Sequence, residues 1–132
     1  MAQVYEGIVA WQRADDLAVS ICGATEEFPR SELCGLVSQM RRAAVSVPAN
    51  IAEGSARQYL KQYLHFLHPA RSSLTELAYH SHLRRRLGFV DESAAAKLSH
   101  LRDVASPPLY GLISWVEEQI ESGQVLNRKP VG

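Results

Sequence analysis

Residues 39–54 read QMRRAAVSVPANIAEG, and this stretch decides the fold of the chain. Together with the residues before it, it places an apolar side chain at every third or fourth position, which is the repeat of one face of an α-helix. Ser31 can cap this helix, and Glu32 suits its first turn because an acidic side chain favours the positive end of the helix dipole. We therefore predict an amphipathic helix that ends near Gly54 and is kinked at Pro48, where proline removes a backbone donor. Its apolar stripe consists of Leu33, Leu36, Val37, Met40, Ala44, Val47 and Ile51.

The same periodicity predicts a helix on each side of this one. The helix before it covers residues 9–27 and stops at Phe28-Pro29, because a residue that precedes proline is disfavoured in the helical region. The helix after it covers residues 56–87, bends at Pro69 and is closed by Gly88. Their apolar stripes are Trp11, Ala14, Leu17, Ala18, Ile21, Thr25 and Phe28 in the first, and Leu60, Tyr63, Leu67, Ala70, Leu74, Leu77 and Ser81 in the second.

A fourth helix begins at Asp91, which can cap it, and is broken or kinked at Pro107-Pro108. Short linkers, roughly three to five residues long, favour antiparallel neighbours. We therefore predict an all-α fold, an antiparallel up-down four-helix bundle with proline kinks in helices 2, 3 and 4. Residues 1–121 form its single domain, and residues 122–132 form a flexible tail. The apolar stripe of the fourth helix is Leu98, Leu101, Ala105, Leu112, Val116 and Gln119.

The composition is that of one globular domain, with 132 residues of which 46% are hydrophobic and 21% charged. Fourteen basic and fourteen acidic side chains give no net charge, but residues 30–86 hold nine basic against three acidic ones. Either the acidic helices on both sides neutralise this basic block, or the block attracts an anionic partner.

Cysteine usage and hydropathy both point to the cytoplasm. Cys22 and Cys34 are too few for a disulfide framework. The chain opens without a basic stretch followed by an apolar run, which a signal peptide would need. No apolar run approaches the ~18 residues of a membrane span. We expect a cytoplasmic protein that has no membrane partner.

Sequence signatures of catalysis and metal binding are missing. There is no P-loop, dinucleotide fingerprint or His-Glu-x-x-His motif. Glu76 and His80 lack the spacing of a di-metal carboxylate bundle, and the pair His65 and His68 would leave a metal site incomplete. We predict no catalytic residue, metal or cofactor; an enzyme would need a pocket in which side chains of several helices converge. Trp11 and Trp115 occupy apolar positions and are predicted to lie in the core.

A polar stripe shares the central helix with the apolar one. Its members are short or hydrogen-bonding side chains, with Ala43 and Ala49 near their edges, whereas a solvent-facing stripe is usually rich in lysine and glutamate. Such a surface lets another helix approach closely. We interpret it as a second packing face, used against another helix or another subunit; the alternative is an ordinary polar face. The motif comprises Gln39, Arg42, Ser46, Asn50, Glu53 and, at the helix end, Gly54.

Basic side chains gather on the next predicted helix. Arg57, Lys61, His65 and His68 follow one another at helical spacing, so one face could track phosphates. Tyr63 and Phe66 are as compatible with the core as with base stacking. An arginine cluster at the end of this helix could bind phosphates as well, or could simply favour the negative end of the helix dipole. The candidate nucleic-acid-binding residues are Arg57, Lys61, His65, His68, Arg71, Arg84, Arg85 and Arg86.

The run of residues 39–54 resembles the four helix bundle protein family, also called the 23S rRNA intervening sequence proteins. The resemblance covers roughly residues 9–120 and includes Trp11 and the Leu87-Gly88-Phe89 turn. It implies a bundle that forms a ring-like homopentamer, with no established enzymatic activity, and it favours a structural or inter-subunit role for the polar stripe. Some members are encoded within insertions in 23S rRNA genes.

A related branch of the family serves reverse transcriptases of diversity-generating retroelements and is thought to bind nucleic acid and the polymerase. The neutral net charge departs from that strongly basic branch. Other departures from the family pattern are Pro69, Ser72 and Pro107-Pro108. We therefore predict a non-enzymatic, homo-oligomeric scaffold or interaction protein. The alternative is an RNA-binding module that uses the basic face of the third helix.

Overall fold

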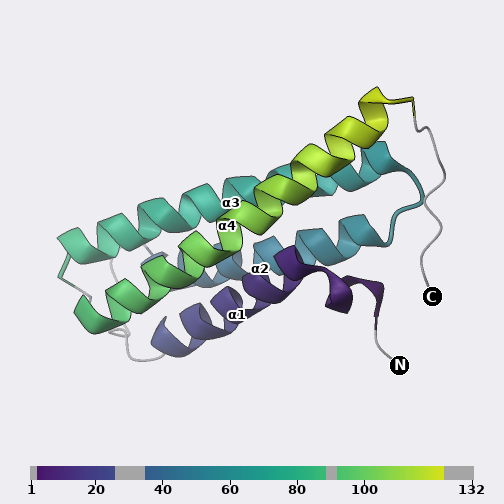
Figure 1. Cartoon of the computed structure of the whole chain (residues 1–132). Helices are drawn as coiled ribbons and strands as arrows, with labels where there is room; N and C mark the ends of the chain where they lie inside the picture. The colour runs from purple at the N-terminus through teal and green to yellow at the C-terminus, as the bar shows by residue number, and fades with distance from the viewer. Residues whose placement is uncertain (1–2, 26–34, 89–91, 124–132) are drawn as a thin grey trace.

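Four long helices account for most of the chain. The computed structural model describes residues 3–25, 35–88 and 92–123. A short 3-10 helix, η1 (Val4–Gly7), leads into α1 (Val9–Ala24), and α2 (Leu36–Ser55), α3 (Leu60–Arg86) and α4 (Glu92–Glu121) follow. They alternate in direction, and each packs against two others, so that α2 lies between α1 and α3 while α4 closes the bundle against the same two helices (Figure 1). The predicted all-α, up-down four-helix bundle is confirmed.

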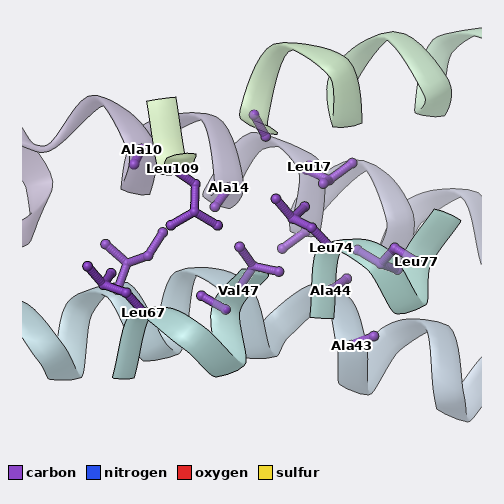
Figure 2. Packing of buried hydrophobic residues seen from close by; sticks show 14 of the residues in the cluster. Ala10, Ala14, Leu17, Ala43, Ala44, Val47, Leu67, Leu74, Leu77 and Leu109 are labelled. Carbon is purple, nitrogen blue, oxygen red and sulfur yellow. The ribbon is translucent and has the colours of Figure 1, made fainter. Parts of the chain in front are cut away.

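The core follows the predicted apolar stripes. On α3, every apolar member from Leu60 to Leu77 is buried. Figure 2 shows Leu67 and Leu74 of α3 gathered with Val47 of α2 and with Leu109 of α4. Alanines on α1 and α2 allow the helix axes to approach closely, because they add little bulk at the points of contact. These are Ala10, Ala14, Ala18, Ala43 and Ala44.

The start of α3 differs from the prediction. The sequence indicated a helix from residue 56, but α3 begins at Leu60, and Tyr59 before it has an extended backbone with φ −113° and ψ 143°. Amides of Ala56 and Arg57 close the end of α2 by hydrogen bonds to the carbonyls of Glu53 and Gly54, at 3.3 and 3.1 Å. The chain needs these residues to reverse direction between two antiparallel helices. Arg57 therefore lies in the turn and not on α3.

The predicted start of α2 is wrong as well: the sequence placed the cap at Ser31 and the first turn at Glu32, but α2 begins at Leu36, and Gly35 before it has a left-handed φ of 64°. The end of α3 agrees with the prediction. Gly88 has the left-handed φ of 76° that suits a helix C-cap, and its amide donates to the carbonyl of Arg85 at 3.2 Å. The predicted stops and caps at Phe28-Pro29, Ser31 and Asp91, like the tail from residue 124 onward, lie outside the described residues.

Four prolines lie within the helices: Pro48 in α2, Pro69 in α3, and Pro107 and Pro108 in α4. α4 continues through Pro107 and Pro108 from Glu92 to Glu121, so the predicted break is wrong, while the predicted kinks stay predictions. Pro69 and Pro107 are exposed, and a backbone carbonyl that loses its amide partner on that side of a helix can be hydrated.

The predicted core of α4 is confirmed at Leu98, Ala105 and Val116 and is wrong at Trp115. Trp115 is 46% exposed. The buried side of α4 passes through Leu109 and Ile113, whereas Leu112, which the sequence suggested, is only partly buried. The sequence analysis left out Leu109 and Ile113, which connect the predicted Ala105 and Val116 in steps of four, four and three residues across the prolines. Trp11 is partly buried and packs against the core, with its ring 4.8 Å from that of Tyr5.

Candidate functional site

The polar stripe of α2 lies along the line where α2 meets α3. We define the α2–α3 seam as the residues that contact one another along this line. Its middle is a hydrogen-bonded cluster in which Ser73 Oγ of α3 donates to Ser46 Oγ of α2 at 2.9 Å. Asn50 Nδ2 donates to the same hydroxyl at 2.9 Å and to the Ser46 carbonyl at 2.8 Å. The seam consists of Arg42, Ser46, Asn50 and Gly54 on α2 and Tyr63, Phe66, Ser73, Glu76 and His80 on α3.

At one end of the seam the two helices come very close. A Cβ atom built on Gly54 would lie 2.8 Å from Tyr63 Cδ1 and 3.0 Å from Phe66 Cβ. Both distances are shorter than normal carbon contacts. Only glycine allows this approach, so the sequence motif ends in Gly54 for a packing reason.

At the other end, charged groups meet. Glu76 Oε1 lies 3.6 Å from Arg42 Nη2 and 3.7 Å from His80 Nε2. Arg42 also donates to Gln39 Oε1. The Arg42 side chain is 66% exposed, so its ion pair with Glu76 is weak and its charge remains accessible.

The seam accounts for part of the predicted motif within one chain. Ser46 contacts α3 directly, Asn50 joins it through a hydrogen bond, and Gly54 contacts α3 by packing. Gln39 and Glu53 are exposed. A role of this motif between subunits stays a prediction.

A second surface of α2 was missed in the sequence. We define the outer face of α2 as Ser38, Val45, Ala49, Ala52 and Ala56. Val45 is 51% exposed, and all the others are exposed except Ala52, which is half-buried. The spacing of four, three and four residues from position 45 to position 56 was the available signal, since it keeps small or apolar side chains on one line.

The basic residues around the start of α3 share a hollow. Arg57 forms an ion pair with Glu53 at 3.4 Å, and its guanidinium lies 4.7 Å from the centre of the Phe66 ring. The hollow beside them has a volume of about 370 Å³. It is lined by Arg57, Lys61, Gln62, His65 and Phe66. The structure thus brings three of the predicted nucleic-acid-binding residues together.

The remaining basic residues are spread out. His68 and Arg71 are exposed on α3, and Arg71 lies beside Thr75 and Tyr110 at another hollow. The three arginines at the end of α3 do not form one surface, because Arg84 is only 2% exposed while Arg85 and Arg86 are exposed. Burial lowers the pKa of Arg84, and the neighbouring charge of Arg85 lowers it further.

Neither a metal centre nor a membrane span is found in the part of the chain that the structure describes. No three His, Cys, Asp or Glu side chains gather there in a metal-binding arrangement. None of its helices is both long and apolar enough to cross a membrane.

Fold and surface together define a small helical-bundle protein with a hydrogen-bonded seam between its second and third helices. The chain belongs to the family of 23S rRNA-intervening sequence proteins, whose pattern matches residues 6–110. The match confirms the resemblance and includes the seam, the outer face of α2 and all of α3. A comparison with curated proteins gives no match.

Proposed function

We propose that this chain is a non-enzymatic protein that assembles with copies of itself, as a homopentamer, and acts as a scaffold or interaction protein. The observation that carries the proposal is the outer face of α2. A helix in a monomeric bundle normally turns long charged side chains to water, whereas this face carries one valine, three alanines and a serine.

The chemistry of this face suits a helix of another subunit. Small side chains allow close approach of the helix axes, and Val45 supplies apolar area at its centre. Arg42 and Glu53 flank the face and are 66% and 61% exposed, so they are available to pair across a symmetric contact. A partner that covers the face would remove the exposed apolar surface from water.

The first test compares two equivalent substitutions by size-exclusion chromatography with light scattering. Val45→Glu places a carboxylate in the proposed contact, where an unpaired buried charge costs several kcal/mol. We expect the wild type to elute with the mass of a pentamer and Val45→Glu to elute as a monomer with unchanged helix content. Val19→Glu is the control, because Val19 is 66% exposed on α1, outside the proposed contact. A monomeric wild type would refute self-assembly, and a pentameric Val45→Glu would refute this interface.

A second candidate function is RNA binding at the hollow beside the start of α3. The observation in its favour is that Arg57, Lys61 and His65 adjoin an aromatic ring there, Phe66, which is only half-buried. Cations that follow a phosphate backbone beside an aromatic side chain are the elements of single-stranded nucleic-acid binding.

RNA binding at this hollow is tested by charge reversal. We expect the double substitution Arg57→Glu and Lys61→Glu to weaken binding of a single-stranded RNA and to reduce the slope of log K against log salt by about 2, one unit per lost phosphate contact. Arg13→Glu on α1 is the control, since Arg13 is exposed and does not line this hollow. If the wild type fails to bind RNA at low salt, or if both variants weaken it equally, this candidate is excluded.

A further inference from the structure

A cavity of about 160 Å³ lies between residues of the C-terminal turns of α3 and residues of the first turns of α4. Figure 1 shows that α3 ends and α4 begins at the same end of the bundle. We call this cavity the arginine pocket. It belongs neither to the seam nor to the outer face of α2. Its polar lining comprises Ser81, His82, Arg84 and Arg85 of α3 and Ser99 and Arg102 of α4.

The charge of the arginine pocket is one-sided. Three guanidinium groups border it, and none of its described lining residues is acidic. Arg102 has an acidic neighbour in Asp103 at 3.6 Å, but Asp103 is 69% exposed, so water screens that pair. The pocket therefore presents a positive potential to any ion that enters it.

Arg84 makes this charge unusual. Its side chain is only 2% exposed, and guanidinium groups are rarely so deeply buried. Burial, and then the charge of Arg85, lower the pKa of Arg84, and a guanidinium nevertheless remains protonated in proteins.

We propose that the arginine pocket, which Arg84 also lines, binds a phosphate group through Arg85 and Arg102, with the hydroxyls of Ser81 and Ser99 as further donors. Planar guanidinium forks match the oxygens of phosphate, and donors that arrive from two helices suit a tetrahedral anion better than a flat carboxylate. The cavity holds a phosphate-sized group but is smaller than the roughly 300–1,000 Å³ of pockets that enclose drug-sized molecules. The proposal is independent of self-assembly, since the residues involved lie on α3 and α4.

The test measures binding of inorganic phosphate to the full chain by calorimetry, against chloride at equal ionic strength. We expect phosphate to bind the wild type, and Arg85→Gln and Arg102→Gln each to raise the Kd about 10-fold, the effect of losing about 1.4 kcal/mol. Arg86→Gln is the matched control. Arg86 is the chain neighbour of Arg85 and is exposed on the same helix end, but it does not line the cavity. The Kd of Arg86→Gln for phosphate should remain within about a factor of two of the wild-type value, a smaller change than the loss of one charge-assisted hydrogen bond would cause.

Two results would overturn the proposal. In the first, the wild type gives the same heat with phosphate as with chloride. In the second, Arg86→Gln raises the Kd as much as Arg85→Gln does, which would mean that only the general charge of the helix end matters. Circular dichroism confirms that each variant remains folded. Once phosphate binding is established, competition identifies its source. An RNA oligonucleotide with a terminal phosphate that displaces inorganic phosphate, when its hydroxyl-ended counterpart does not, assigns the pocket to an RNA end. If neither displaces it, the ligand is a small phosphate compound.

Discussion

The close packing of α2 against α3 requires a residue without a side chain at Gly54. An alanine there would place its Cβ 2.8 Å from Tyr63 Cδ1 and 3.2 Å from the Tyr63 carbonyl oxygen. The backbone oxygen cannot rotate away as a side chain can, so α2 and α3 would have to separate. Overpacking of this kind costs about 1–3 kcal/mol, against which alanine regains roughly 0.5–1 kcal/mol of helix propensity.

We therefore expect Gly54→Ala to lower the free energy of unfolding by about 1–2 kcal/mol in urea denaturation. Gly111→Ala is the matched control, because Gly111 lies within α4 and its added methyl group would meet nothing within 4 Å. That substitution should raise stability by roughly 0.5–1 kcal/mol. Equal effects of the two substitutions would show that α2 and α3 are not in close contact at Gly54.

Individual side chains of the seam illustrate what a sequence can predict at this scale. The short polar residues on α2 indicated a close packing face, and the contact between Ser46 and Ser73 realises it within the chain. The sequence left open whether the face met a helix of the same chain or of another subunit, since helical spacing describes one helix and not its neighbour. Phe66 was equally ambiguous, and only the structure places it under Arg57.

Among the helices, the apolar repeat predicted the buried lines even across prolines, and the prediction failed at the turn before α3. α3 has its predicted buried line from Leu60 to Leu77 despite Pro69. On α4 the predicted line includes Ala105 and Val116, which are buried, but it left out Leu109 and Ile113, which the continuous helix buries beside the prolines. Helical propensity is a local quantity, and packing against α1 and α3 outweighs the cost of the prolines.

The predicted start of α3 was wrong because a local pattern does not show where the chain must turn. Residues 56–59 are compatible with a helix by themselves, but an antiparallel bundle needs a reversal between α2 and α3. The basic face of α3 therefore differs from the predicted one. Arg57 does not share a helix with Lys61; it lies in the turn before α3 and lines the same hollow from there.

At the scale of the whole molecule, the basic block of residues 30–86 forms ion pairs within itself in the described part of the chain. Its ion pairs in the described residues use Glu53 and Glu76, which belong to the block itself. Arg41 turns to α1 but meets neutral groups there, with its Nε 2.8 Å from Thr25 Oγ1. Two sites are proposed to bind anions, and they lie at opposite ends of α3. One is the hollow at the start of α3, and the other is the arginine pocket at its end.

Self-assembly, if it covers the outer face of α2, must also be visible in the stability of the whole molecule. A pentamer that unfolds to single chains is stabilised by mass action, so its melting temperature depends on protein concentration even when no free folded monomer is present. A roughly 100-fold increase in concentration adds about 2 kcal/mol per chain. With an unfolding entropy of about 2.1 cal/mol/K per residue over 132 residues, this raises the melting temperature by about 5–10 °C.

We expect that rise in the wild type and in Val19→Glu, whereas Val45→Glu should melt at one temperature throughout the range, because its outer face no longer associates. Differential scanning calorimetry at low and high concentration measures all three proteins. A concentration-independent melting temperature in the wild type would mean that the folded chain is monomeric, and the alanines of the outer face would then need another partner. The same rise in Val45→Glu would place the contact elsewhere, and Arg42, whose charge is accessible at the end of the seam, would be the next position to substitute.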